Sequence, residues 1–97
     1  MADLFVVAIL YAEAEQEGRL RAGLTTIVDA SRKDEGNLQY DLFVDQGDAR
    51  RFVLVEHWTD RAAQQKHDAE NPQIAHFRKH GASVVEKVDV FFLDKIV

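Results

Sequence analysis

The sequence predicts an α+β domain in which helices cover one antiparallel β-sheet. Four apolar segments have the short length or the period-two alternation of strands, and two regions carry apolar residues at helical spacing. These segments follow one another in the order strand–helix–strand–strand–helix–strand. The chain of 97 residues has no proline-rich linker and no repeat, so we expect residues 1–97 to form a single domain.

The first strand is expected at "LFVVAILY", residues 4–11. This run is continuously apolar and rich in Val, Ile and Phe, which indicates a strand buried on both faces. Residues 13–31 change to helical spacing, and one side of that helix carries Leu20, Leu24, Ile27, Val28 and Ser31. The following "KDEGN" predicts a turn in which Gly36 adopts a positive φ.

The middle of the chain predicts a β-hairpin. In "LQYDLFV", residues 38–44, alternate positions place four side chains on one face: Leu38, Tyr40, Leu42 and Val44. The segment "DQGDA" is typical of a hairpin turn, and "RFVLVEHW", residues 51–58, forms the returning strand.

The second helical region is interrupted. Thr59 or Asp60 is expected to cap a helix over residues 61–70. "NP" at 71–72 then predicts a second short helix that runs to about His80 and ends at Gly81. The segment "SVVEKVDVFFLDKIV", residues 83–97, is expected to form the final strand.

This order of elements predicts a ferredoxin-like βαββαβ arrangement, with a four-stranded antiparallel sheet and both helical regions on one side. The other side of the sheet would present a broad apolar surface, because the first and last strands are apolar on both faces. Monomeric proteins rarely expose such a surface. We therefore predict that a second copy covers it in a symmetric homodimer.

Composition narrows the range of partners. The net charge of -5, without a concentrated basic patch, argues against a nucleic-acid or anionic-membrane partner. No apolar run reaches the roughly 18–20 residues of a membrane span, and the N-terminus lacks the basic start of a signal peptide, so a cytoplasmic location is predicted. The absence of cysteine excludes disulfides, thiolate metal sites and a cysteine nucleophile.

A carboxylate interrupts an apolar strand face. Period-two alternation in "FVLVEHW" places four side chains together: Phe52, Leu54, Glu56 and Trp58. Burying a carboxylate among large apolar groups is costly unless it has a partner. The following helical region carries a stripe that would face the same side, made of Ala63, His67, Glu70, Ile74 and Phe77. We therefore expect His67 and Glu56 to line one space together with Trp58.

Two interpretations of this space remain open. One is structural: a hydrogen bond between His67 and Glu56, or a buried carboxylate that caps a loop amide. The other is a small aromatic-walled pocket that contains a general base or a hydrogen-bond donor. Tyr40 is either a core aromatic residue or a substrate contact, and Asn37 either a turn residue or a ligand group.

His76 and His80 have an i, i+4 spacing that can hold a metal. They have no evident inward carboxylate partner, so no metal site is expected.

Three segments resemble the antibiotic biosynthesis monooxygenase domain family, including its small quinol monooxygenase-like members: "SRKDEGNLQYDLF", "RFVLVEHWTDRAAQQKH" and "NPQIAHF". The resemblance runs from about Leu4 to Phe92. It implies a dimeric α+β barrel that oxidises a quinol or phenolic aromatic substrate with molecular oxygen, without flavin, haem or metal. In the implied chemistry a polar residue helps to deprotonate the phenol, and the anion then passes an electron to oxygen.

The resemblance also implies roles for individual residues. The catalytic set would be His67, Glu56, Trp58 and Asn37, with Glu56 orienting or polarising His67. The substrate-binding set would be Tyr40, Phe52, Leu54 and Phe77. Many relatives carry "SPHF" where this chain has "NPQI", so Gln73 takes the usual position of a second histidine, which argues against a two-histidine mechanism.

Three alternatives stand beside the monooxygenase. Haem-degrading relatives carry an asparagine in the first strand, which "LFVVAILY" lacks. An isomerase of a small phosphorylated dicarbonyl compound would use His67 or Glu56 as proton shuttle and Arg32 or Lys33 to bind phosphate. A non-enzymatic ligand-binding or stress-related dimer would retain the pocket without turnover.

Overall fold

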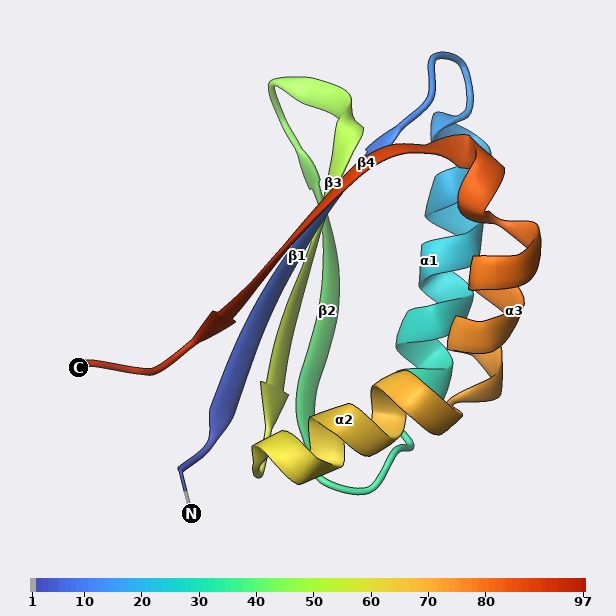
Figure 1. The fold of residues 1–97 in the computed structure, drawn as a ribbon. Coiled ribbons are helices and arrows are strands. Elements are labelled where there is room, and N and C mark those ends of the chain that lie inside the picture. The colour runs from blue at the N-terminus through green and yellow to red at the C-terminus, as the bar shows by residue number, and fades with distance from the viewer. Residues whose placement is uncertain (1) are drawn as a thin grey trace.

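A computed structural model describes residues 2–97 and confirms the predicted order of elements. The elements are β1 (Leu4–Ala12), α1 (Glu17–Ser31), β2 (Asn37–Asp45), β3 (Asp48–Trp58), α2 (Arg61–Glu70), α3 (Pro72–His80), the 3-10 turn η1 (Ala82–Val84) and β4 (Val85–Leu93). The sheet is antiparallel, with strand order β2-β3-β1-β4, so the fold is ferredoxin-like as predicted. Figure 1 shows the three helices on one side of the sheet, with α2 crossing near one end.

Several element boundaries differ from those predicted. The strand β3 begins at Asp48 rather than at residue 51, because Asp45 pairs with Asp48 around Gln46 and Gly47. The first helix begins at Glu17 rather than at residue 13, because Glu15 has a φ of 66° and Gln16 N donates to Glu13 O in a turn. The last strand spans Val85–Leu93, because residues 82–84 form η1. No helix among residues 2–97 combines the length and apolar character that crossing a membrane requires.

The core lies between the helices and one face of the sheet. Every second residue of β1 is buried there, and β3 continues the face with Phe52, Leu54, Glu56 and Trp58. The helix α1 contributes Leu20, Leu24, Ile27 and Val28. The intervening residues of β1 are only half-buried, so the prediction that this strand is buried on both faces is wrong for the single chain. The helices cover only one side of the sheet, which leaves these residues partly open to water.

A β-bulge near the start of β2 changes its predicted register. Asn37 pairs with Trp58 and Gln39 pairs with His57, so Leu38 is an extra residue without a cross-strand partner. Leu38 is exposed, whereas Tyr40 is buried opposite Glu56. Leu38 therefore stands outside the regular alternation on which its predicted face depends.

The break between α2 and α3 is built from side-chain caps. Asp60 accepts a hydrogen bond from Ala63 N at the start of α2. Asn71 Oδ1 accepts from the backbone nitrogens of Gln73 and Ile74, and Pro72 occupies the first turn of α3, as predicted.

The outer face of the sheet, away from the helices, is largely apolar. Its half-buried or exposed apolar residues are Phe5, Val7, Ile9, Phe43, Val53, Val55, Phe91 and Leu93. His57 lies on this face, opposite to Glu56 and Trp58 as predicted. Its ring stacks on Phe5 at a centroid distance of 4.1 Å, and its Nε2 lies 2.7 Å from Asp3 Oδ2.

Candidate functional site

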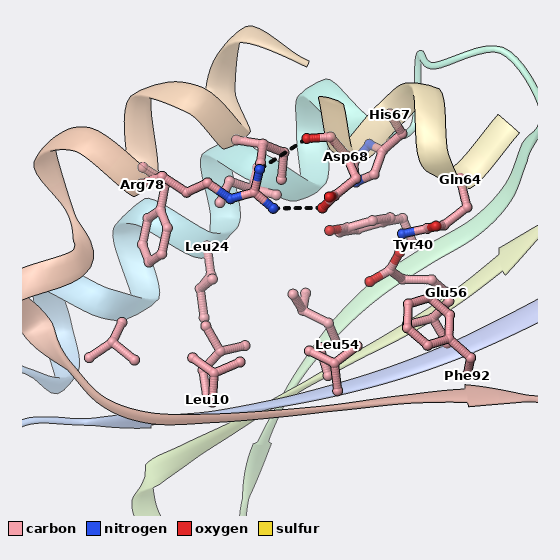
Figure 2. Close-up of a pocket in the computed structure, with 18 of the residues that line it drawn as sticks. Leu10, Leu24, Tyr40, Leu54, Glu56, Gln64, His67, Asp68, Arg78 and Phe92 are labelled. Carbon is pink, nitrogen blue, oxygen red and sulfur yellow. Dashed lines mark hydrogen bonds and ion pairs between the residues drawn. The ribbon is translucent and has the colours of Figure 1, made fainter. Parts of the chain in front are cut away.

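An open cavity of about 860 Å³ lies between the helices and the sheet (Figure 2). Its floor and walls are mostly aliphatic and aromatic, and include Leu10, Leu24, Leu54, Ile74 and Phe77. Along β4 the lining residues Val88, Val90 and Phe92 are exposed, which marks the open side. The volume and the apolar lining suit a small aromatic molecule.

Polar groups gather at one end of this cavity. Tyr40 and Glu56 are cross-strand partners on β2 and β3, and α2 crosses above them with Gln64, His67 and Asp68. Figure 2 shows the polar ends of Tyr40, Glu56 and Gln64 in this region, away from Leu10 and Leu24. A ligand in the cavity can therefore place its ring on apolar side chains and its polar substituents here.

Glu56 is a buried carboxyl, and its residue is only 5% exposed. Its Oε1 accepts a hydrogen bond from Trp58 Nε1 at 3.0 Å. Burial raises the pKa of Glu56 to about 7, because desolvation of the charged form outweighs the hydrogen bond from Trp58, and the nearby Asp68 adds to the rise. At neutral pH this carboxyl can therefore either accept or release a proton.

His67 is paired with Asp34. Its Nδ1 lies 2.7 Å from Asp34 Oδ2, and Asn71 Nδ2 donates to the same oxygen at 2.8 Å. The hydrogen bond between His67 and Glu56, one of the interpretations that the sequence left open, is not formed. Asp34, in the turn after α1, pairs with His67 Nδ1, and the indole N–H of Trp58 donates to Glu56 Oε1. Both residues nevertheless line the same cavity.

Aromatic rings hold His67 in place. Its ring centroid lies 4.6 Å from that of Trp58 and 5.5 Å from that of Tyr40. Burial raises the pKa of the Tyr40 phenol well above its usual value, and the charge of Glu56 raises it further. The nearby Ser31 hydroxyl lowers the pKa of Tyr40, but by less than burial and Glu56 raise it. The Ser31 oxygen is buried and makes no hydrogen bond of standard geometry. Tyr40 therefore remains a neutral hydroxyl near pH 7.

The structure brings five of the eight predicted site residues to the cavity: Tyr40, Leu54, Glu56, His67 and Phe77. Three do not line it. Trp58 is fully buried behind Glu56 and His67, and Phe52 belongs to the core. Asn37 donates to Gln39 O at the start of β2.

The isomerase alternative requires a cationic group in the cavity to bind phosphate, and the two residues suggested for this role lie outside it. Arg32, suggested as a phosphate-binding group, donates to Tyr40 O and pairs with Asp41, and neither Arg32 nor Lys33 lines the cavity. Arg78, on α3, does line it, but its guanidinium is paired with Asp68 at 2.7 Å.

The sequence-based prediction missed Gln64, Asp68 and Asp34. Gln64 lies three residues before His67, and residues at this spacing share a face of a helix, so the helical stripe contained the signal for it. The sequence predicts only a turn at Asp34. Its contact with α2 depends on how that turn packs, and Thr59 N donating to Gly36 O fixes the packing.

The His76 and His80 rings lie 4.6 Å apart outside the cavity. With Gln73 they line a separate, smaller groove between α1 and α3. Within residues 2–97, no three His, Cys, Asp or Glu side chains are grouped as a metal site.

Comparison with known proteins gives concordant matches. Residues 3–82 match the model of the family described as antibiotic biosynthesis monooxygenase. A Bacillus subtilis (strain 168) protein named "Putative monooxygenase YcnE" is 35% identical over 71 residues, which are 73% of this chain and 70% of that protein.

Solved structures agree with these matches. PA3566 from Pseudomonas aeruginosa is 27% identical with a TM-score of 0.94, covering 100% of this chain and 97% of that one. A structure described as antibiotic biosynthesis monooxygenase is 28% identical with a TM-score of 0.88, covering 97% and 99% of the two chains.

Proposed function

Because the chain belongs to the antibiotic biosynthesis monooxygenase family, we propose that it oxidises a phenolic or quinol aromatic substrate with molecular oxygen. The observation that supports this proposal best is the placement of Glu56. A buried carboxyl with a pKa of about 7 stands at the polar end of an otherwise apolar cavity, where it can take the proton of an aromatic hydroxyl.

The first step is proton transfer. The aromatic ring of the substrate lies against the apolar walls, and its hydroxyl donates to the second carboxylate oxygen of Glu56. Trp58 holds the first oxygen by its indole N–H, which fixes the direction of the carboxyl group. His67, held by Asp34, and Tyr40 form the adjoining wall. Transfer of the proton to Glu56 leaves an electron-rich phenolate against the apolar side chains of the cavity.

The second step is oxidation of that phenolate. It gives one electron to oxygen, and the resulting phenoxyl radical combines with superoxide at a ring carbon to form a carbon–oxygen bond. The peroxide accepts the proton held by Glu56 and then loses water to leave a carbonyl. The balance is one aromatic C–H and one hydroxyl plus O₂ giving a quinone and H₂O. One oxygen atom enters the product and the other enters water, and the substrate supplies all the electrons without an external reductant.

The proposed assembly is a homodimer. Its support is the apolar outer face of the sheet, which the helices of the same chain leave open within the described residues. Packing the outer faces of two copies together would remove this surface from water while both cavities stay on the outside.

Oxygen uptake tests the function directly. Purified protein is incubated with a panel of naphthols, naphthoquinols and anthrones, and uptake is followed with an oxygen electrode while the quinone is identified by mass after labelling with ¹⁸O₂. Glu56→Gln should lower the rate by about 10²–10⁴-fold, since it cannot accept the proton. Glu70→Gln, which changes an exposed carboxyl on α2 outside the cavity, is the matched control. Absence of uptake by the unmodified protein, or full activity of Glu56→Gln, would reject the proposal.

A further inference from the structure

Gln64 is an amide on the wall of the cavity. The residue is 9% exposed and lines the cavity. Its backbone N–H bonds to Asp60 O. Its amide nitrogen and oxygen are not among the buried side-chain atoms that lack a partner, so solvent in the cavity reaches them. A ligand that displaces this solvent must replace its hydrogen bonds to the amide, or affinity is lost.

The amide supplies what its neighbours lack. Figure 2 shows the end of Gln64 directed toward the region of Tyr40 and Glu56. An ionised Glu56 can only accept hydrogen bonds, and the Tyr40 hydroxyl has a single hydrogen to donate, whereas a primary amide has two.

The cavity's arginines are engaged elsewhere. Arg78 pairs with Asp68, and the guanidinium of Arg61 lies 4.6 Å from the centroid of the Phe92 ring. Of the two lining glutamines, Gln64 is buried and Gln65 is exposed, so Gln64 is the amide held in place at the polar end.

We propose that Gln64 is a specificity-determining residue that donates a hydrogen bond to a carbonyl oxygen of the substrate while Glu56 accepts one from its hydroxyl. The inference rests on the proposed function, which places an aromatic hydroxyl against Glu56. The preferred substrate class is then an uncharged aromatic hydroxyketone rather than a phenol without a carbonyl. A phenol that lacks the carbonyl leaves the Gln64 amide unpaired in the complex, which weakens binding by about tenfold.

A matched pair of probes tests the preference by binding alone. 5-Hydroxy-1-tetralone carries an aromatic hydroxyl and a ketone, and 5,6,7,8-tetrahydro-1-naphthol has the same skeleton without the ketone. Each is titrated into the protein by calorimetry in the absence of oxygen. Quenching of Trp58, the single tryptophan, locates both probes at this end of the cavity.

Two variants test whether the preference for the ketone probe depends on Gln64. The unmodified protein should bind the ketone probe about tenfold more tightly than the naphthol, and Gln64→Met, which keeps length and helix propensity, should reduce this ratio to near one. Gln73→Met, on α3 and outside the cavity, should keep the tenfold ratio. Thermal unfolding followed by circular dichroism establishes that both variants fold.

Two results would overturn the inference: equal binding of the two probes by the unmodified protein, or an unchanged preference in Gln64→Met. The proposed function fails separately. If the protein prefers the ketone probe through Gln64 but consumes no oxygen with any phenol, the proposed oxidation is rejected and the role of Gln64 in substrate recognition is supported. Oxygen uptake together with an unchanged preference in Gln64→Met rejects only the role of Gln64.

Discussion

His67 Nδ1 lies 2.7 Å from Asp34 Oδ2, so the histidine of α2 is tied to the turn that leads into β2. Asn71 joins the same carboxylate oxygen through its amide while its own oxygen caps α3. One carboxylate therefore connects three parts of the chain behind the cavity wall. His67 is 5% exposed and packs against Trp58, so the orientation of its ring depends on this junction.

Removing the carboxylate should loosen the junction. Asp34→Ala leaves both His67 Nδ1 and the Asn71 amide without their acceptor, and we expect the free energy of unfolding to fall by about 2–3 kcal/mol. Urea denaturation measures this change. Asp68→Ala is the control, because it breaks an exposed ion pair with Arg78 and should cost no more than about 1 kcal/mol. If both variants lost the same free energy of unfolding, the hydrogen bonds of Asp34 would contribute no more to stability than an exposed ion pair.

The turn at Gly36 requires the absence of a side chain. Its φ is +83°, and an added Cβ would lie 2.5 Å from Ala63 Cβ and 2.7 Å from Thr59 Oγ1. Gly36→Ala should lower the free energy of unfolding by at least about 2 kcal/mol, since it combines backbone strain with a clash against α2. In the same denaturation assay Gly18→Ala should leave stability unchanged or raise it by up to about 1 kcal/mol, because Gly18 lies in α1 with open space around it. If Gly36→Ala and Gly18→Ala had the same free energy of unfolding, the turn at Gly36 would not require a glycine.

The order of helices and strands could be predicted from the sequence because each element is marked by residues within or beside it. The apolar run of β1, the Asn71–Pro72 cap and the glycine turn at 36 all act within a few residues. The bulge at Leu38 escaped prediction because period-two alternation assumes an uninterrupted ladder, and the extra residue becomes visible only when Asn37 and Gln39 are paired with β3.

The sequence was enough to predict several of the residues that line the candidate site, but not their hydrogen-bond partners. Alternation placed Glu56 on the helix-covered face, and helical spacing brought His67 above it. Their partners could not be inferred in the same way. Trp58 is two residues from Glu56 on the same strand, whereas Asp34 is 33 residues from His67 and reaches it through tertiary packing. Sequence spacing carries no information about such a contact.

The outer face of the sheet predicts a dimer. Sedimentation at micromolar concentration should give about twice the chain mass of 11.0 kDa. Val55→Glu places a charge near the centre of this face, beside Val7, and should yield a folded monomer, because burying an unpaired carboxylate opposes association. Val44→Glu, at an exposed position on the helix side of the sheet, should remain dimeric. A monomeric unmodified protein, or a dimeric Val55→Glu, would remove this proposal.

Glu56 should make stability depend on pH in a direction opposite to that of most carboxyls. Its pKa is about 7 in the folded chain against an ordinary value of 4.5, so the folded state binds the proton more tightly between these pH values. The contribution of Glu56 to stability therefore decreases as pH rises through that window and is constant above about pH 7. Gln has no proton to lose, and its carbonyl can still accept from Trp58 Nε1. The stability of Glu56→Gln relative to the unmodified protein should thus rise by about 2–3 kcal/mol between pH 5 and pH 8.

Urea unfolding of both proteins at several pH values gives this difference directly, and all other titrating groups cancel in it. Glu70→Gln provides the control, since Glu70 is exposed and the corresponding difference should stay flat. A flat difference for Glu56→Gln would mean that the carboxyl is already ionised in the folded protein at pH 5. The general-base role would then lose its support, because a carboxylate of ordinary basicity takes a phenolic proton far less readily near neutral pH.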